Sequence, residues 1–126
     1  MIRFDIQKAT MLQELIIGRS GGTQGIRDMG LLDAALSSAY QTFGGTEFYL
    51  TIEEKAAKIG SNLIANHAFI DGNKRIGLLI MLTFLEVNDV DIECTDQELV
   101  DIGLSLASGS MKYEELLEWI QKHKQI

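Results

Sequence analysis

Polar side chains of several chemical kinds gather between His67 and Arg75. The segment reads NHAFIDGNKRIG over residues 66–77, and it places a histidine, a carboxylate, an amide and two cations within nine positions. The run that follows, LLIMLTFL over residues 78–85, is almost wholly apolar. Chemically versatile side chains therefore adjoin what the sequence predicts to be a deeply buried segment.

The start of a helix explains this arrangement. Gly72 lets the backbone turn sharply and approach a ligand closely, and a helix is predicted to begin near Asn73. A helix N-terminus has unpaired N–H groups and a partial positive charge, so it binds anions. Lys74 and Arg75 fall in that first turn, where cations disfavour the helix unless an anion is bound. The pattern indicates a phosphate site, with a turn carrying two solvated cations as the alternative.

Two further side chains would complete such a site. Asp71 places a carboxylate beside the expected phosphate, and carboxylates together with phosphates commonly hold Mg²⁺. His67 is expected to end the preceding helix, and histidine is a common general base near neutral pH. Phe69, between them, is expected to point inward and anchor the loop. A histidine at a helix end is, however, more often structural or solvent-exposed.

Composition narrows the class of protein. The 126 residues suit one domain over residues 1–126, with 46% hydrophobic and 23% charged residues. A net charge of −7 argues against nucleic acid as a partner, because that would require a basic face. No signal peptide and no membrane-spanning run is visible. The single cysteine, Cys94, is expected to be buried and inert, and a cytoplasmic location is expected.

Hydrophobic periodicity predicts an all-α fold. The predicted helices span residues 6–17, 31–43, 51–68, 73–88, 95–107 and 113–124. Capping boxes at Thr51–Glu54 and Thr95–Glu98 mark two of the helix starts. Residues 18–30 are glycine-rich and read as a loop, while GGTEFYL over residues 44–50 could form a short hairpin. We therefore expect a compact bundle of about six helices with one short hairpin flap.

The segment HAFIDGNKR resembles the motif of the Fic/Doc family, written His-x-Phe-x-Asp/Glu-Gly-Asn-x-Arg. Every fixed position is present, namely His67, Phe69, Asp71, Gly72, Asn73 and Arg75. The segments GGTQGIRDMGLLDAAL, EKAAKIGSNLIANHAF and LLEWI also resemble the small stand-alone death-on-curing (Doc) branch. The resemblance covers nearly the whole chain and implies the all-α Fic/Doc fold.

The resemblance implies a transferase that uses ATP. Larger Fic enzymes move AMP from ATP to a protein hydroxyl, and they have glycine where this chain has Lys74 and a second arginine where it has Leu78. Doc-type proteins carry lysine at the first of these positions and phosphorylate a hydroxyl of elongation factor Tu, which arrests protein synthesis. The resemblance therefore implies a toxin-type protein kinase. An AMP transferase and a non-catalytic binding module are the alternatives, and the intact His67 and Asp71 count against the second.

Roles follow from the matched positions of the motif. The resemblance makes His67 the base that activates the target hydroxyl, and Asp71 the residue that holds Mg²⁺, through water. Gly72, Asn73 and Lys74 would form the anion cradle. Arg75 would grip the β- or γ-phosphate of ATP, the co-substrate.

Several residues outside the motif are weaker candidates. Arg19 and Arg27 flank the glycine-rich loop and could reach the phosphates or the target, although solvated side chains are an equal alternative; of the two, Arg19 is favoured. His123 is expected to be a surface residue, and Tyr113 and Trp119 to lie in the core or at its rim. The 44–50 flap could pair with a substrate segment by strand addition.

The resemblance also implies inhibition by a partner. Toxins of this branch act with a small antitoxin, whose C-terminal segment folds onto the toxin. Some Fic proteins instead carry an inhibitory segment, Ser/Thr-x-x-x-Glu-Gly/Asn, within the same chain. The nearest match here, SMKYEE, ends in Glu115 rather than glycine or asparagine. An antitoxin acting in trans is therefore expected.

Overall fold

The computed structural model describes residues 1–70 and 72–125, and in this part of the chain it is an all-α fold with one small hairpin. The elements are α1 (Ile6–Ser20), α2 (Met29–Ser37), the 3₁₀ turn η1 (Ser38–Tyr40), β1 (Thr42–Phe43), β2 (Thr46–Glu47), α3 (Ile52–Asn66), α4 (Asn73–Val87), α5 (Asp96–Ser108) and α6 (Tyr113–His123). The predicted fold class is confirmed, and the predicted hairpin is present, although its strands lie within residues 42–47 rather than 44–50. Asp71, a predicted site residue, lies outside the described residues.

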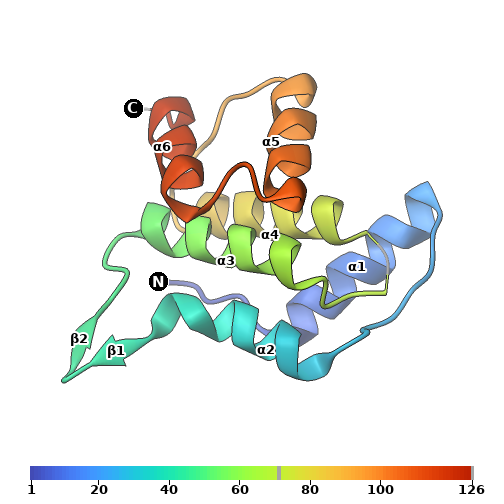
Figure 1. The fold of residues 1–126 in the computed structure, drawn as a ribbon, viewed down its shortest axis with the longest axis horizontal. Helices are drawn as coiled ribbons and strands as arrows, with labels where there is room; N and C mark the ends of the chain where they lie inside the picture. The colour runs from blue at the N-terminus through green and yellow to red at the C-terminus, as the bar shows by residue number, and fades with distance from the viewer. Residues whose placement is uncertain (71, 126) are drawn as a thin grey trace.

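The α3–α4 pair forms the centre of the molecule. Figure 1 shows the two helices side by side, with α1 and α2 below them and α5 and α6 above. The predicted apolar helix is α4, and its inward side chains are fully buried against α3. These are Ile76, Ile80, Met81, Phe84 and Leu85 from α4, and Ala56, Ile59, Leu63 and Ile64 from α3. The loop between the two helices is therefore fixed at both ends by the core.

Glycine sets how closely the two central helices approach. Gly77 of α4 is buried, and a Cβ placed there would lie 2.7 Å from Cγ1 of Ile64 on α3. Because that distance is shorter than any normal carbon–carbon contact, a larger residue would push the helices apart. This close approach lies next to the loop that carries the motif.

The capping boxes start their helices as predicted. The Thr51 hydroxyl accepts the N–H of Glu54 at 3.0 Å, and the Glu54 carboxylate accepts the N–H of Thr51 at 3.2 Å. Thr95 and Glu98 form the same reciprocal pair at the start of α5. Both signals are local in sequence, so they need no tertiary contact to act.

The helix predicted over residues 31–43 differs most from the structure. It begins earlier, at Met29, because the Asp28 side chain caps it by accepting the N–H of Leu31 at 3.0 Å. It ends earlier, because the buried hydroxyl of Ser38 donates to the Ala35 carbonyl and the chain tightens into η1. Residues at the predicted C-terminal end form β1 instead.

Two predictions about the C-terminal half are wrong. His123 is not simply a surface residue: Nε2 lies 2.6 Å from a Glu98 oxygen, Nδ1 lies 2.7 Å from the Trp119 carbonyl, and the ring stacks on Trp119. These contacts join the end of α6 to the start of α5. Cys94 is half-buried rather than buried. Burial and the nearby Glu98 and Asp96 carboxylates raise the pKa of the Cys94 thiol, which favours its protonated form.

Tyr113 and Trp119 pack against the core while staying partly exposed, as predicted. In the described part of the chain, no helix combines the length and the apolar character that crossing a membrane requires.

Candidate active site

His67 lies directly after α3 in a strained backbone conformation. It caps the C-terminus of α3 with φ 49° and ψ 49°, in the left-handed region. Residues other than glycine rarely adopt this conformation, and they concentrate at functional sites when they do. Its side chain is exposed to solvent. The chain therefore turns sharply at the one histidine of the motif and presents it at the surface.

The loop after His67 is held by an earlier segment of the chain. Ile26 forms an antiparallel bridge with Phe69, and the N–H of Ile70 donates to the Gly25 carbonyl at 3.1 Å. The Phe69 side chain is only 1% exposed. It anchors the loop in the core as predicted, so the motif loop is fixed by backbone pairing and by burial.

Asn73 closes the motif loop on itself. Its side-chain oxygen accepts the N–H of Phe69 at 3.0 Å, and its side-chain nitrogen donates to the Phe69 carbonyl, also at 3.0 Å. Both polar atoms of the amide thus contact backbone. In an anion cradle, Asn73 would contribute its backbone N–H, since its side chain already holds the loop.

Gly72 joins the loop to α4 in a left-handed conformation, with φ 79° and ψ 17°. A Cβ at this position would lie 3.4 Å from Cδ1 of Ile17 and 3.5 Å from a guanidinium nitrogen of Arg75. These two distances are ordinary van der Waals contacts, so a side chain here would be disfavoured by the left-handed backbone rather than by lack of space. The motif glycine therefore permits the turn that leads into α4.

The charge at the start of α4 differs from that at the start of α3, α5 and α6. The first turns of α3, α5 and α6 all contain acidic residues, as the helix dipole favours. The first turn of α4 contains none, and it carries the exposed Lys74 and Arg75 instead. In a chain of net charge −7, this pair of cations is placed against both the dipole and the overall composition.

A pocket brings most of the predicted site residues together. Its volume is about 360 Å³, and its walls include His67, Gly72, Asn73, Lys74 and Arg75. Ile70 and Ala107 complete the lining, so the end of α5 also contributes. Ala107 carries no chemical group that a reading of the sequence could have recognised. The histidine and both cations thus face one space at the N-terminus of α4.

A second, more apolar groove of about 500 Å³ adjoins this pocket between α1, α4 and α5. Leu78 lines the groove together with Leu82, Leu99 and Leu104, and it does not line the histidine pocket. The position where larger Fic enzymes carry a second arginine is therefore part of an apolar surface here. Lys74 and Arg75 border both spaces.

The two arginines outside the motif behave differently from each other. Arg19 is exposed in the last turn of α1 and is not among the residues that line the pocket. Arg27 is also exposed, but its guanidinium donates to the carbonyls of His67, at 2.7 Å, and of Asn66, at 3.0 Å. Arg27 therefore holds the end of α3. Nothing in the sequence indicates this contact, because it joins segments about 40 positions apart.

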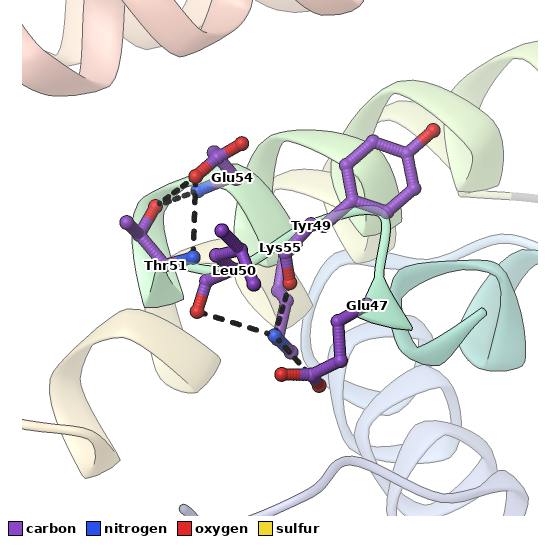
Figure 2. Close-up of polar contacts among 6 residues, drawn as sticks. All are labelled: Glu47, Tyr49, Leu50, Thr51, Glu54 and Lys55. Atoms are coloured by element: carbon purple, nitrogen blue, oxygen red, sulfur yellow. Dashed lines mark hydrogen bonds and ion pairs between the residues drawn. The ribbon is translucent and has the colours of Figure 1, made fainter. Parts of the chain in front are cut away.

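The hairpin flap is tied to α3 by a buried lysine, which the sequence analysis did not single out. Figure 2 shows the Lys55 ammonium between the Glu47 carboxylate, at 3.2 Å, and the carbonyls of Tyr49 and Leu50. The side chain of Lys55 is only 3% exposed. Beyond this anchor the flap exposes Phe43 and Phe48 to solvent.

The described residues contain no group of three histidine, cysteine or acidic side chains placed to hold a metal ion. The predicted metal residue, Asp71, lies outside the described part of the chain. The cations and backbone N–H groups at the start of α4 are chemically suited to a polyphosphate, and Lys74 and Arg75 line the pocket.

Comparison with known proteins agrees with this geometry. The model of the Fic/DOC family matches residues 3–85, which is more than half of the chain. A protein named Toxin Doc, from Mycolicibacterium smegmatis, is 42% identical over 72 residues, covering 57% of this chain and 55% of that protein. The match therefore spans only about half the length of that relative. On the extent of the family match, the chain belongs to the Fic/DOC family.

Proposed function

We propose that this protein is a toxin-type protein kinase that transfers the γ-phosphate of ATP to a hydroxyl of a translation factor of the elongation factor Tu class. Transfer would arrest protein synthesis. The observation that carries the proposal is that His67, Lys74 and Arg75 line one pocket at the N-terminus of α4. Membership of the Fic/DOC family and the similarity to a protein named Toxin Doc support it.

His67 is the proposed general base. One imidazole nitrogen accepts the proton of the target hydroxyl as the hydroxyl oxygen bonds to the γ-phosphorus of ATP; the bond from that phosphorus to the ADP oxygen breaks, and ADP is the leaving group. The exposed position of His67 at the pocket edge lets a protein substrate reach the ring. The left-handed backbone at this residue is the strain that is expected where a side chain must point in one direction.

Lys74, Arg75 and the backbone N–H groups of the first turn of α4 are the proposed phosphate-binding groups. Mg·ATP, when bound, would supply the phosphoryl group and a divalent cation. The cationic side chains and the helix N-terminus stabilise the charge that spreads over the phosphate oxygens during transfer. The carboxylate of Asp71, which follows Ile70 in the chain, is proposed to hold the magnesium ion through water.

The choice of phosphoryl over adenylyl transfer rests on Lys74 and Leu78. Lys74 extends from the first turn of α4 into the space that a glycine would leave open, and it lines the pocket. This side chain would occupy part of the cradle for an α-phosphate, so the nucleotide would bind with its γ-phosphate toward His67. Leu78 faces the apolar groove, so it offers no second cation to the phosphates.

Replacing the lysine tests this choice. Lys74→Gly removes the side chain but keeps the backbone donors, so phosphates should still bind. The variant is expected to lose phosphotransfer and to gain at most a small AMP transfer, because Leu78 supplies no second arginine. The mass added to the target protein distinguishes the two products. Wild-type protein that adds AMP, or a Lys74→Gly variant that phosphorylates at the full rate, would favour the AMP transferase.

An antitoxin is the proposed partner in trans, and the apolar groove beside the pocket is its proposed docking surface. Leu104 and Val100 of α5 are each 53% exposed there, while Lys74 and Arg75 lie at the groove edge. This combination suits an amphipathic segment with apolar side chains in the groove and carboxylates at the cations. Such a segment would cover the entrance to the phosphate site.

A charge placed in the groove tests this partner. Leu104→Asp should prevent neutralisation by the proposed antitoxin while leaving transfer to the target unchanged. Leu15→Asp is the matched control, because Leu15 is exposed to a similar extent on α1 and does not line the groove. Equal effects of the two variants on neutralisation would contradict the proposed docking surface.

A further inference from the structure

Arg27 contacts three consecutive carbonyls at the end of α3. Its Nε donates to the His67 carbonyl at 2.7 Å, and a terminal nitrogen of the guanidinium donates to the Asn66 carbonyl at 3.0 Å. Its backbone N–H donates to the Ala68 carbonyl at 2.8 Å. One residue therefore bonds the carbonyl before the histidine, the carbonyl of the histidine and the carbonyl after it.

The Asn66 and His67 carbonyls lie at the C-terminus of α3, the least satisfied part of a helix, and the Ala68 carbonyl follows directly after it. The last carbonyls of an α-helix have no partner within the helix, and they carry the negative end of its dipole. The left-handed backbone of His67 also prevents α3 from continuing and supplying partners. The Arg27 guanidinium meets both needs, because it is a cation and a planar fork with several N–H donors.

The direction of the His67 side chain follows from this backbone. The bond from Cα to Cβ is fixed once the flanking peptide planes are fixed, and Arg27 bonds the peptide plane on each side of His67. The same backbone places His67 on the wall of the pocket that Lys74 and Arg75 share. Arg27 is not among the residues that line this pocket, so it has no place at the phosphates.

We infer that Arg27 is a positioning residue for His67: it stabilises the left-handed turn that aims the imidazole at the phosphate pocket. The inference rests on the proposed role of His67 as general base. Arg27 is secured in turn by its neighbours, since Asp28 also donates its N–H to the Ala68 carbonyl while its side chain caps α2. The start of α2 thus supports the end of α3.

A spectroscopic test isolates the positioning from the chemistry. The chain has two histidines, so a histidine-labelled sample gives two imidazole signals by NMR, and His123→Gln identifies which belongs to His67. Arg27→Ala should shift or broaden the His67 signal and leave that of His123 in place. Arg3→Ala is the matched control, because this exposed arginine lies over the Tyr40 ring and contacts neither histidine. An unchanged His67 signal in Arg27→Ala would overturn the inference.

A kinetic test then connects the position to the reaction. Arg27→Ala should lower the rate of transfer at saturating substrate by about 10- to 100-fold, which is the usual cost of a misplaced catalytic group. Affinity for Mg·ATP should stay unchanged. Arg27→Lys keeps the positive charge but loses the planar fork, so it should recover only part of the rate. Should Arg27→Ala fail to fold, Arg27→Lys carries both measurements.

The outcomes separate this inference from the proposed function. A His67 signal that moves in a protein showing no transfer to any target would contradict the proposed kinase and leave the positioning intact. A His67 signal that stays fixed, or a loss of Mg·ATP affinity equal to that of a phosphate-site variant, would contradict the positioning whatever the reaction is.

Discussion

Lys74 and Arg75 lie in the first turn of α4, where the proposed phosphate would bind. Three helices of this protein begin with carboxylates, which the helix dipole favours, and α4 begins with two exposed cations. Cations at a helix N-terminus cost roughly 0.3–1 kcal/mol each in the absence of an anion. At the scale of single residues, this local cost is the feature that the proposed phosphate site accounts for.

Arg75→Ala should therefore weaken Mg·ATP binding. Loss of a charge-assisted hydrogen bond removes about 1.5–3 kcal/mol, which corresponds to roughly a 10- to 100-fold rise in the dissociation constant. Calorimetry or a fluorescent nucleotide analogue would measure the change, with Arg3→Ala as the control away from the pocket. Arg27→Ala should likewise leave the affinity for Mg·ATP unchanged, because Arg27 holds the backbone of His67 and does not line the pocket. If Arg75→Ala and Arg3→Ala bind the nucleotide with equal affinity, the start of α4 is excluded as the anion site.

The central pair of helices determines where the motif lies. His67 ends α3 and Gly72 begins α4, so the spacing between these two helices sets the geometry of the loop between them. The buried Gly77 allows the close contact with Ile64 that maintains this spacing. At the scale of elements, the geometry of the site therefore depends on the contact between Gly77 of α4 and Ile64 of α3, two residues that do not take part in the proposed reaction.

Gly77→Ala should destabilise the protein by about 1–3 kcal/mol through overpacking, because the added Cβ would lie 2.7 Å from Ile64. Gly18→Ala is the matched control. Gly18 lies in α1, and a Cβ there would have no neighbour within 4 Å, so alanine should stabilise the protein by roughly 0.5–1 kcal/mol. Urea unfolding of the two variants should move the midpoint in opposite directions. A Gly77→Ala midpoint at or above that of the wild type would show that α3 and α4 can separate at little cost.

Lys55 makes the flap part of the α3 framework. Lys55→Met keeps most of the side-chain volume but leaves the Glu47 carboxylate and the carbonyls of Tyr49 and Leu50 without their buried donor. We expect faster hydrogen exchange across residues 42–50 and a loss of about 1–3 kcal/mol in stability. Lys122→Met, at an exposed ion pair on α6, is the control and should change neither quantity. Unaltered exchange in the Lys55 variant would mean that the flap is held by other contacts.

The sequence predicted the helix starts that depend on contacts between residues close together in the chain. Capping boxes at Thr51 and Thr95 start α3 and α5 because both partners lie within four positions. The role of Arg27 and the burial of Lys55 depend on segments that meet only in the folded chain, so no local pattern indicates them. The end of α2 was misplaced for a similar reason, because the buried Ser38 also accepts a hydrogen bond from Asn62 of α3. Of the residues predicted for the site, His67, Gly72, Asn73, Lys74 and Arg75 line one pocket and Arg19 does not. No local pattern indicates that the Asn73 side chain holds the loop.

At the scale of the whole molecule, a contact between His123 and Glu98 joins the two C-terminal helices, α6 and α5. The Trp119 carbonyl and the Glu98 carboxylate hold the pKa of His123 above its ordinary value, although its partial burial opposes this. The Thr95 N–H and the His123 ring hold the pKa of Glu98 below its ordinary value. Residues on either side extend the link, since Ile92 and Lys124 form a bridge and the Glu93 N–H donates to the His123 carbonyl.

This pair predicts a pH dependence of stability. The contribution of His123 is fully present below its ordinary pKa of 6.5 and is lost as the pH rises through its raised folded-state pKa. That of Glu98 is present above its ordinary pKa of 4.5 and is lost as the pH falls through its lowered value. His123→Gln should therefore destabilise the protein most between about pH 4.5 and 6.5 and least in alkaline solution. If the urea midpoint of His123→Gln differs from that of the wild type by the same amount at about pH 4.5–6.5 and in alkaline solution, this pH dependence is contradicted.

The most direct test of the proposed function is the mass of the target protein after incubation with this protein and Mg·ATP. Purified elongation factor Tu should gain one phosphoryl group on a hydroxyl side chain. His67→Ala, folded to the same stability as the wild type, should form that product about 10²- to 10⁴-fold more slowly. A target that gains AMP, a target that stays unmodified, or a His67→Ala variant that modifies it at the full rate would contradict a kinase in which His67 is the base.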